Sequence, residues 1–168
     1  MVTGAARGIG FAIASAASKA GASVAINDLT VEMADKAVVS ITKSGGEACA
    51  APGDVSVRGG ALEIVNRAAN VLGGLDGLVN NAGIDRFGTV ATTTDEDWDA
   101  TIAVNFSAVF HMCRAARAHL TESRGSIVNI ASIAADHPSV TVGSYSSAKA
   151  AVLSHQSHIH NRRCRRAI

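Results

Sequence analysis

The sequence predicts an α/β fold, a doubly wound parallel sheet with helices on both faces, and three features carry the prediction. Short apolar runs alternate along the chain with longer stretches of helical pattern. The apolar runs are continuous, as expected of parallel strands that are covered on both sides. Glycines follow the stretches of helical pattern, where they commonly end helices.

The predicted elements follow from apolar runs for the strands and from helical periodicity between glycines for the helices. Strands are expected at residues 23–27, 47–51, 75–80 and 126–130. Helices are expected at residues 8–20, 31–44, 57–72, 95–121 and 145–154. Thr94 is the expected N-cap of the long helix, with Asp97 as the acid of a capping box.

Composition bounds the class of protein. Of 168 residues, 48% are hydrophobic and 17% charged, which fits one globular domain. No apolar run approaches the roughly 20 residues of a membrane span, and we expect no membrane partner. No secretory signal pattern opens the chain. The three cysteines are scattered without a C-x-x-C pair, which favours a reducing compartment and a cytoplasmic location.

The net charge of +1 conceals an uneven distribution. Residues 155–168 contain four arginines and no acidic residue, whereas the other residues carry 11 basic and 14 acidic groups. The body of the chain therefore has no excess of positive charge with which to bind a phosphate backbone. We expect no nucleic-acid partner.

A glycine-rich loop opens the chain, reading Thr-Gly-Ala-Ala-Arg-Gly-Ile-Gly over residues 3–10 and running into the first predicted helix. Gly4 suits a tight turn, Gly8 lets backbone N–H groups approach a pyrophosphate, and Gly10 permits close packing of helix on strand. The helix N-terminus offers unpaired N–H groups and partial positive charge to an anion. The spacing differs from the commoner dinucleotide fingerprint.

Asp28 follows the strand at 23–27 and stands 18 residues past Gly10. A carboxylate there accepts hydrogen bonds from the adenosine ribose hydroxyls and repels a 2′-phosphate, which favours NAD over NADP. Arg7 gives the opposite indication, because its charge attracts a 2′-phosphate. Asp28 has more weight, because its position after the second strand is the one that contacts the ribose.

Two further loops carry polar and small residues at strand ends. Residues 80–83 read Asn-Asn-Ala-Gly, and Ser132 follows the strand at 126–130. The glycine loop, Asp28, residues 80–83 and Ser132 thus fall on one edge of the sheet. In open α/β sheets that edge binds ligands.

Tyr145 and Lys149 are four residues apart on a predicted helix. One helical turn places both side chains on the same face. A nearby ammonium favours the phenolate form of a tyrosine, so the two together form a proton-transfer device.

Taken together, these motifs resemble the short-chain dehydrogenase/reductase family, whose members have a Rossmann-like fold. Residues 3–10 match its TGxxxGxG loop, residues 80–83 its NNAG, and residues 145–149 its YxxxK. Ser132 and Asn105 stand where its catalytic Ser and helix Asn are found. Asp54 and Val55, in Gly-Asp-Val, resemble its adenine contact. The residues that the resemblance assigns to cofactor binding are Gly4, Arg7, Gly8, Ile9, Gly10, Asp28, Leu29, Asp54, Val55, Asn81, Ala82, Gly83, Tyr145 and Lys149.

The resemblance also implies roles. Tyr145 exchanges a proton with the substrate oxygen, Lys149 holds the nicotinamide ribose, Ser132 bonds the substrate oxygen, and Asn105 anchors a water in the proton relay. The implied partner is a small alcohol or ketone, with hydride passing to or from the nicotinamide. A full-length parent is expected to form homo-oligomers.

Both ends depart from the family pattern. Only Met1 and Val2 stand where the family has a whole central strand, and the pattern stops near residue 154. We therefore expect a truncated nucleotide-binding domain at residues 1–154, incomplete at both ends, and a basic His/Arg tail at residues 155–168. Two other interpretations of this tail are metal binding by His155, His158 and His160, and nucleic-acid binding by the arginines. Short His-rich or Arg-rich tracts are weak signals of either, so we favour a frameshift near residue 155. We expect no metal site.

The sequence thus predicts an NAD-dependent oxidoreductase of alcohols and carbonyls. Two alternatives remain. The first is a non-catalytic remnant that binds nucleotide weakly, and the second is a protein that docks on full-length relatives through the helices at 95–121 and 145–154.

Overall fold

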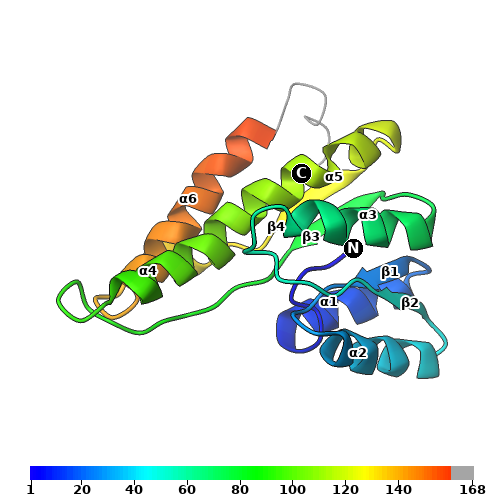
Figure 1. Ribbon diagram of the computed structural model, residues 1–168, viewed down its shortest axis with the longest axis horizontal. Helices are drawn as coiled ribbons and strands as arrows, with labels where there is room; N and C mark the ends of the chain where they lie inside the picture. The colour runs from blue at the N-terminus through cyan, green and yellow to red at the C-terminus, as the bar shows by residue number, and fades with distance from the viewer. Residues whose placement is uncertain (160–168) are drawn as a thin grey trace.

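The computed structural model describes residues 1–159, and of residues 157–159 only the backbone. Strands and helices alternate along the chain as predicted (Figure 1). The strands are β1 (Ser23–Ile26), β2 (Glu47–Ala50), β3 (Gly77–Asn80) and β4 (Ser126–Asn129). The α-helices are α1 (Gly8–Lys19), α2 (Val31–Lys43), α3 (Gly60–Leu72), α4 (Asp95–Ile102), α5 (Ala108–Glu122) and α6 (Gly143–Ile159).

Two parallel strand pairs are joined through the first residues of the chain. β1 pairs with β2, and β3 pairs with β4. Val2 lies between the pairs and bridges Ile26 of β1 and Val79 of β3, both in parallel. The Val2 N–H donates to Ala25 O at 3.0 Å, and the Val79 N–H donates to Met1 O at 2.9 Å. The expected central position of the first strand is confirmed, although that strand is reduced to a short stub.

The helices cover both faces of the sheet, as continuous apolar strands require. On one face, Ala25 and Leu78 pack against α3 and α5 in one apolar cluster. On the other face, Val2 and Ile26 pack against α1 and α2 in a second cluster. Neighbouring residues of β1 therefore enter opposite clusters, which fixes the register of the strand.

Two predicted helices differ from the structure. The helix expected from residue 57 begins at Gly60, because the Asp54 carboxylate accepts hydrogen bonds from the N–H and hydroxyl of Ser56 and holds the preceding residues in a turn. The stretch predicted as one helix at 95–121 contains a π-helical turn, Ala103–Ser107 (η1), between α4 and α5. Figure 1 shows α4 and α5 continuing each other along one rod.

Helix α6 runs past residue 154, where we placed a domain boundary. The ring of His155 lies 6.1 Å from that of Phe106 and 5.8 Å from that of Phe110, centroid to centroid. Gln156 Oε1 accepts a hydrogen bond from Asn129 Nδ2. Residues 155 and 156 are thus part of the folded unit, and the boundary stays a prediction. The rest of the predicted tail, which includes His158 and His160, lies outside the residues whose side chains are described.

Two properties of the described residues bear on membrane and metal binding. None of the helices in this part of the chain has the length and apolarity to cross a bilayer. Over the same residues, His, Cys, Asp and Glu form no group of three or more that could hold a metal ion.

Replacing Val2 by alanine tests the role of the stub. Val2 is 2% exposed and contacts both halves of the sheet. Val2→Ala should lower the free energy of unfolding by about 2 kcal/mol, from lost apolar burial and the cavity left behind. Val90→Ala is the control, because Val90 is 100% exposed. Urea denaturation followed by circular dichroism measures both, and equal losses would contradict the central role of Val2.

Candidate cofactor and active site

The glycine loop lies close against residues 80–83. Gly4 has a φ of +59°, and a Cβ there would lie 2.9 Å from Ala82 Cα, so this position excludes a side chain. Gly8 also has a φ of +59°, but a Cβ there would meet nothing within 4 Å. The loop is therefore packed at Gly4 and open at Gly8, where α1 begins.

Thr3 fastens the two loops together. Its buried hydroxyl oxygen accepts hydrogen bonds from the N–H groups of Asn81 and Ala82, each at 3.0 Å. In return, Asn81 Nδ2 donates to Thr3 O at 2.9 Å and to Gly4 O at 3.0 Å. Asn81 and Ala82, both predicted to bind the cofactor, thus also hold the loop in shape.

Asp28 connects β1 to the glycine loop. Its Oδ2 accepts a hydrogen bond from the Ala6 N–H, and its Oδ1 accepts one from the Leu29 N–H, both at 2.9 Å. Each carboxylate oxygen retains a further lone pair that a ribose hydroxyl can use. Leu29 is exposed, and so are Arg7 and Ile9 in the loop. Among the described residues, these three side chains take no part in the hydrogen bonds that hold the loop.

The predicted adenine contacts are placed differently from each other. The Asp54 carboxylate is exposed and bonded within its own turn to Ser56. The Val55 side chain is 4% exposed and belongs to the apolar core on the α3 and α5 face. Only the backbone of Val55 can therefore face a ligand.

The loop end of α1 fits the phosphates of a dinucleotide. Arg7 occupies the N-cap position and makes no side-chain hydrogen bond to the helix. The first N–H groups of α1 thus remain directed at the open space over Gly8, with the favourable partial charge of a helix N-terminus. The residues present at this end of α1 fit the phosphates of a nicotinamide dinucleotide.

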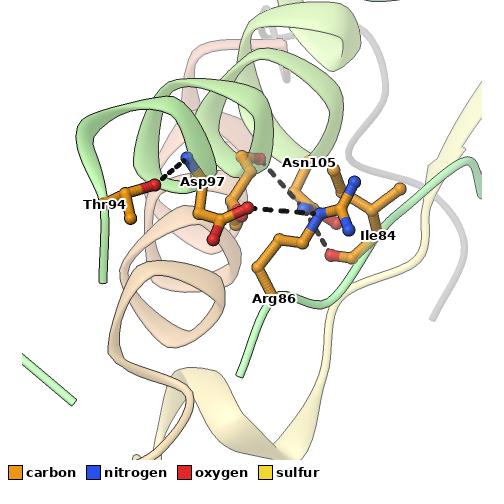
Figure 2. A network of polar contacts seen from close by, with 6 residues as sticks. Ile84, Arg86, Thr94, Asp97 and Asn105 are labelled. Atoms are coloured by element: carbon orange, nitrogen blue, oxygen red, sulfur yellow. Dashed lines mark hydrogen bonds and ion pairs between the residues drawn. The ribbon is translucent and has the colours of Figure 1, made fainter. Parts of the chain in front are cut away.

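Asn105 lies inside the π-helical turn and holds the segment after residue 83 (Figure 2). Its Nδ2 donates to Ile84 O at 2.8 Å and to Thr101 O at 2.9 Å. A Cβ on Gly83 would lie 2.8 Å from Asn105 Oδ1, so Gly83 permits this approach. Within the described residues, Oδ1 is buried without a hydrogen-bond partner.

The start of α4 beside Asn105 shows how the helix is anchored. Thr94 is the N-cap, as predicted, and its hydroxyl accepts a hydrogen bond from the Asp97 N–H at 3.1 Å. The Asp97 carboxylate pairs with Arg86 at 3.6 Å (Figure 2). Asp97 therefore ties α4 to the loop that follows β3.

Lys149 is buried beside Tyr145 on α6. Its side chain is 3% exposed, and Nζ lies 5.7 Å from the centroid of the half-buried Tyr145 ring. Nζ donates to Ile130 O at 2.8 Å, just past the end of β4. Burial lowers the pKa of the Lys149 ammonium, because the charged form loses solvation. The structure therefore brings the predicted pair together at the carboxyl end of β4.

Ser132 lies two residues after Ile130 and immediately before the 3₁₀ turn Ile133–Ala135 (η2), which packs against α6. Its Oγ accepts a hydrogen bond from the Ala134 N–H at 3.2 Å, and the residue is half-buried. The hydroxyl hydrogen remains available to donate. Since α6 also packs against η1, the elements carrying Asn105, Ser132 and Tyr145 adjoin one another.

Three residues that build this edge were not singled out from the sequence. Thr3 joins the glycine loop to residues 81–82, and Ile130 supplies a backbone carbonyl to Lys149. Asn27 Nδ2 donates to Ala51 O at 2.9 Å and to Gly53 O at 3.0 Å, which joins the ends of β1 and β2. Asn27 can be recognised in the sequence as a polar residue at the end of an otherwise apolar strand. Nothing local marks Ile130.

Comparison with known proteins gives consistent matches. The family model described as short chain dehydrogenase matches residues 1–165. The chain is 39% identical over 153 residues to the 2,3-dihydro-2,3-dihydroxybenzoate dehydrogenase of Bacillus subtilis, covering 90% of this chain and 59% of that protein. It is 37% identical over 153 residues to the 5-keto-D-gluconate 5-reductase of Escherichia coli, covering 90% and 60%.

Solved structures agree in fold. A dehydrogenase/reductase from Sinorhizobium meliloti 1021 superposes with a TM-score of 0.86 at 38% identity, over 92% of this chain and 62% of that chain. The apo form of LigD from Sphingobium sp. strain SYK-6 gives a TM-score of 0.89 at 30% identity, over 94% and 68%. The chain spans about 60% of the length of the curated relatives that it matches.

Thr3→Val tests the fastening of the two loops, because it keeps the shape of the side chain and removes the hydroxyl. Two partly buried N–H donors, those of Asn81 and Ala82, would lose their acceptor. The free energy of unfolding should fall by about 2 to 4 kcal/mol. Thr121→Val on the exposed side of α5 is the control and should change it by less than about 0.5 kcal/mol. Similar losses in both variants would rule out the fastening role.

Proposed function

We propose that this chain, which belongs to the short-chain dehydrogenase family, is an oxidoreductase of alcohols and carbonyls that uses NAD. The observation that carries the proposal is the buried Lys149 beside Tyr145, bonded to Ile130 at the carboxyl end of β4. An ammonium in such a place loses solvation, and perturbed ionisable groups gather at functional sites. We place the catalytic groups within residues 1–154, with His155 and Gln156 packed on the same folded unit.

In this proposal, Tyr145 is the acid and base. Its phenol donates a proton to the oxygen of a carbonyl substrate, or accepts one from an alcohol in the reverse direction. Ser132 donates a hydrogen bond to the same oxygen, where negative charge develops. The Ser132 hydroxyl suits this role, because its oxygen already accepts from the Ala134 N–H and its hydrogen is free to point outward.

Lys149 and Asn105 support the acid and base. The Lys149 ammonium lies 5.7 Å from the centroid of the Tyr145 ring and has two N–H groups beyond the one given to Ile130. We assign those groups to the nicotinamide ribose. Asn105 presents its buried Oδ1 beside Gly83, and we assign this oxygen to the proton relay.

We assign cofactor binding to the loops at the carboxyl edge of the sheet. Gly8, Ile9 and Gly10 offer the N-terminus of α1 to the pyrophosphate, and Asp28 accepts from the adenosine ribose. The further cofactor residues in this proposal are Gly4, Arg7, Leu29, Asp54, the backbone of Val55, Asn81, Ala82 and Gly83. When bound, the nicotinamide supplies or accepts the hydride.

Tyr145→Phe tests the assigned acid and base. Turnover of NADH with a panel of small ketones should fall about 100- to 10,000-fold, because the group that protonates the substrate is gone. NADH affinity, followed by fluorescence, should stay within about twofold, because the ring is kept. Ser132→Ala should also lower the rate, whereas Ser147→Ala on the exposed side of α6 should not.

Two outcomes of that experiment would count against the proposal. An undiminished rate in Tyr145→Phe would refute the role of the phenol. Saturable NADH binding by the unmodified chain without turnover of any ketone or alcohol would favour a nucleotide-binding protein without catalysis.

Asp28→Asn tests the choice of cofactor. The unmodified chain should bind NADH about 10-fold or more tightly than NADPH, because the carboxylate repels a 2′-phosphate. Asparagine removes the charge while its carbonyl oxygen can still accept from the Ala6 N–H, so the ratio should move toward one. Asp35→Asn on the exposed surface of α2 is the control. Equal affinities for both nucleotides in the unmodified chain would overturn the assignment of Asp28.

A further inference from the structure

The carboxyl ends of β3 and β4 are joined by a pair of asparagine side chains. Asn80 and Asn129 are register partners in these two parallel strands. Asn80 Nδ2 donates to Asn129 Oδ1 at 2.8 Å and to Cys113 Sγ of α5 at 3.3 Å. Asn80 is 4% exposed, and Asn129 is half-buried. Both hydrogens of the Asn80 amide are thus used, and they connect the end of β3 to β4 and to α5.

The asparagine pair adjoins the carbonyl group that holds Lys149. Ile130 directly follows Asn129, and its N–H donates to Asn80 O at 2.9 Å. The Ile130 carbonyl oxygen accepts from Lys149 Nζ at 2.8 Å. The end of β4 is therefore held against Asn80 by a side-chain bond and a backbone bond at successive residues. The direction of the Ile130 carbonyl, and with it the place of the ammonium, depends on these two bonds.

A third contact of Asn129 fixes helix α6 on the same strand end. Asn129 Nδ2 donates to Gln156 Oε1. Gln156 follows Lys149 by seven residues, or about two helical turns, so both side chains lie on one face of α6. Val152 lies between them, is 1% exposed, and packs with Cys113 in the apolar cluster of α5 and α6. Hydrogen bonds on both sides of Val152 along the helix therefore restrict rotation and sliding of α6 against β4.

Stability alone does not account for polar groups at these positions. Within the described residues, Asn80 Oδ1 is buried without a hydrogen-bond partner, which is unfavourable for folding. Burial raises the pKa of the Cys113 thiol to about 11, so the neutral thiol offers Asn80 only a weak acceptor. Apolar side chains at both strand ends would pack at lower cost. The amides add a hydrogen-bonded geometry that apolar contacts do not specify.

We propose that Asn129 is a positioning residue for Lys149. Its bonds to Asn80 and Gln156 fix the end of β4 and the face of α6, and thereby hold the Lys149 ammonium where it meets the nicotinamide ribose. The ribose contact rests on the proposed function, whereas the placing of the ammonium rests on the contacts described here alone. Asn129 acts through Lys149 and itself touches neither substrate nor cofactor.

Asn129→Leu tests the placing of the ammonium in the full chain without cofactor, because leucine has a similar shape and makes no hydrogen bond. The measurement is the rate of Lys149 acetylation by N-acetoxysuccinimide, followed by mass spectrometry and compared with the exposed Lys36. A buried amine reacts only after local opening, so Lys149 should react about 10-fold or more slowly than Lys36 in the unmodified chain. Asn129→Leu should raise the Lys149 rate about fivefold or more, because it favours that opening.

Three further variants separate positioning from a general loss of stability. Asn129→Asp keeps an oxygen that accepts from Asn80 Nδ2, so Lys149 should stay protected to within about twofold. Ile41→Val weakens the apolar cluster on the other face of the sheet and should also leave the Lys149 rate within about twofold. If Asn129→Leu does not fold, Asn129→Ser replaces it. The serine hydroxyl is one bond shorter and loses hydrogen-bond reach to Asn80, so Lys149 should again become reactive.

Binding measurements then connect the place of Lys149 with the ribose. NADH affinity, followed by fluorescence, should fall about fivefold or more in Asn129→Leu. ADP affinity should stay within about twofold, because ADP lacks the nicotinamide ribose. Equal losses for both nucleotides would overturn the connection with the ribose.

The acetylation rates decide the positioning role independently of the cofactor. The role is overturned if Lys149 stays as protected in the leucine and serine variants as in the unmodified chain. It is also overturned if Asn129→Asp or Ile41→Val exposes Lys149 as much as Asn129→Leu does. Failure of the unmodified chain to bind NADH would instead contradict the proposed function, and the acetylation rates would still show whether Asn129 positions Lys149.

Discussion

The pairing of Met1, Val2 and Thr3 with both β1 and β3 is the constraint on which the rest of this structure depends. β1–β2 and β3–β4 are separate parallel pairs, and the backbone bonds of these first residues turn them into one sheet. The same residues lead directly into the glycine loop. The position of α1, and hence of the loop against residues 80–83, is therefore set by a stub of strand. A backbone bond in such a buried place costs about 1 to 3 kcal/mol when it is left unmade, a large share of a domain's total stability.

The two edges of the sheet are built very differently. At the carboxyl edge, side chains form hydrogen bonds with the backbone of neighbouring loops. The pairs are Thr3 with Asn81 and Ala82, Asn27 with Ala51 and Gly53, Asp28 with Ala6, and Lys149 with Ile130. These contacts fix loops that carry little apolar burial of their own. At the opposite edge, an open cavity of about 970 Å³ is lined by the first residues of β1 and β3. Preorganisation is thus concentrated where chemistry is proposed, as precise positioning of catalytic groups requires.

The sequence predicted the strands well, because each is a continuous apolar run that only a sheet covered on both sides accommodates. It predicted less about features that depend on tertiary contacts. The π-helical turn at Ala103–Ser107 coincides with the bonds of Asn105 to Ile84 O and Thr101 O, and helical periodicity does not register such a turn. Val55 was expected at the cofactor, yet its side chain enters the core, since the direction of a loop side chain is not encoded in a motif. The shift of composition after residue 154 did not reveal that His155 packs on η1 and α5 and that Gln156 bonds to β4, because those partners lie 27 or more residues away in sequence.

Lys149 shows how far a physical argument alone leads toward function. A purely structural role is poorly served by an ammonium that is 3% exposed, because burying it costs solvation and lowers its pKa. Within the described residues, its one hydrogen bond, to Ile130 O, is all that offsets this cost. An apolar residue of similar length would pack there at lower cost. The charge is kept one helical turn from a phenol, at the edge where the sheet presents its glycine loop, Asp28 and Ser132. Burial of the Lys149 ammonium is unfavourable for stability, and the groups around it are suited to proton transfer and anion binding. This combination is the pattern expected at a functional site, where some stability is given up for activity.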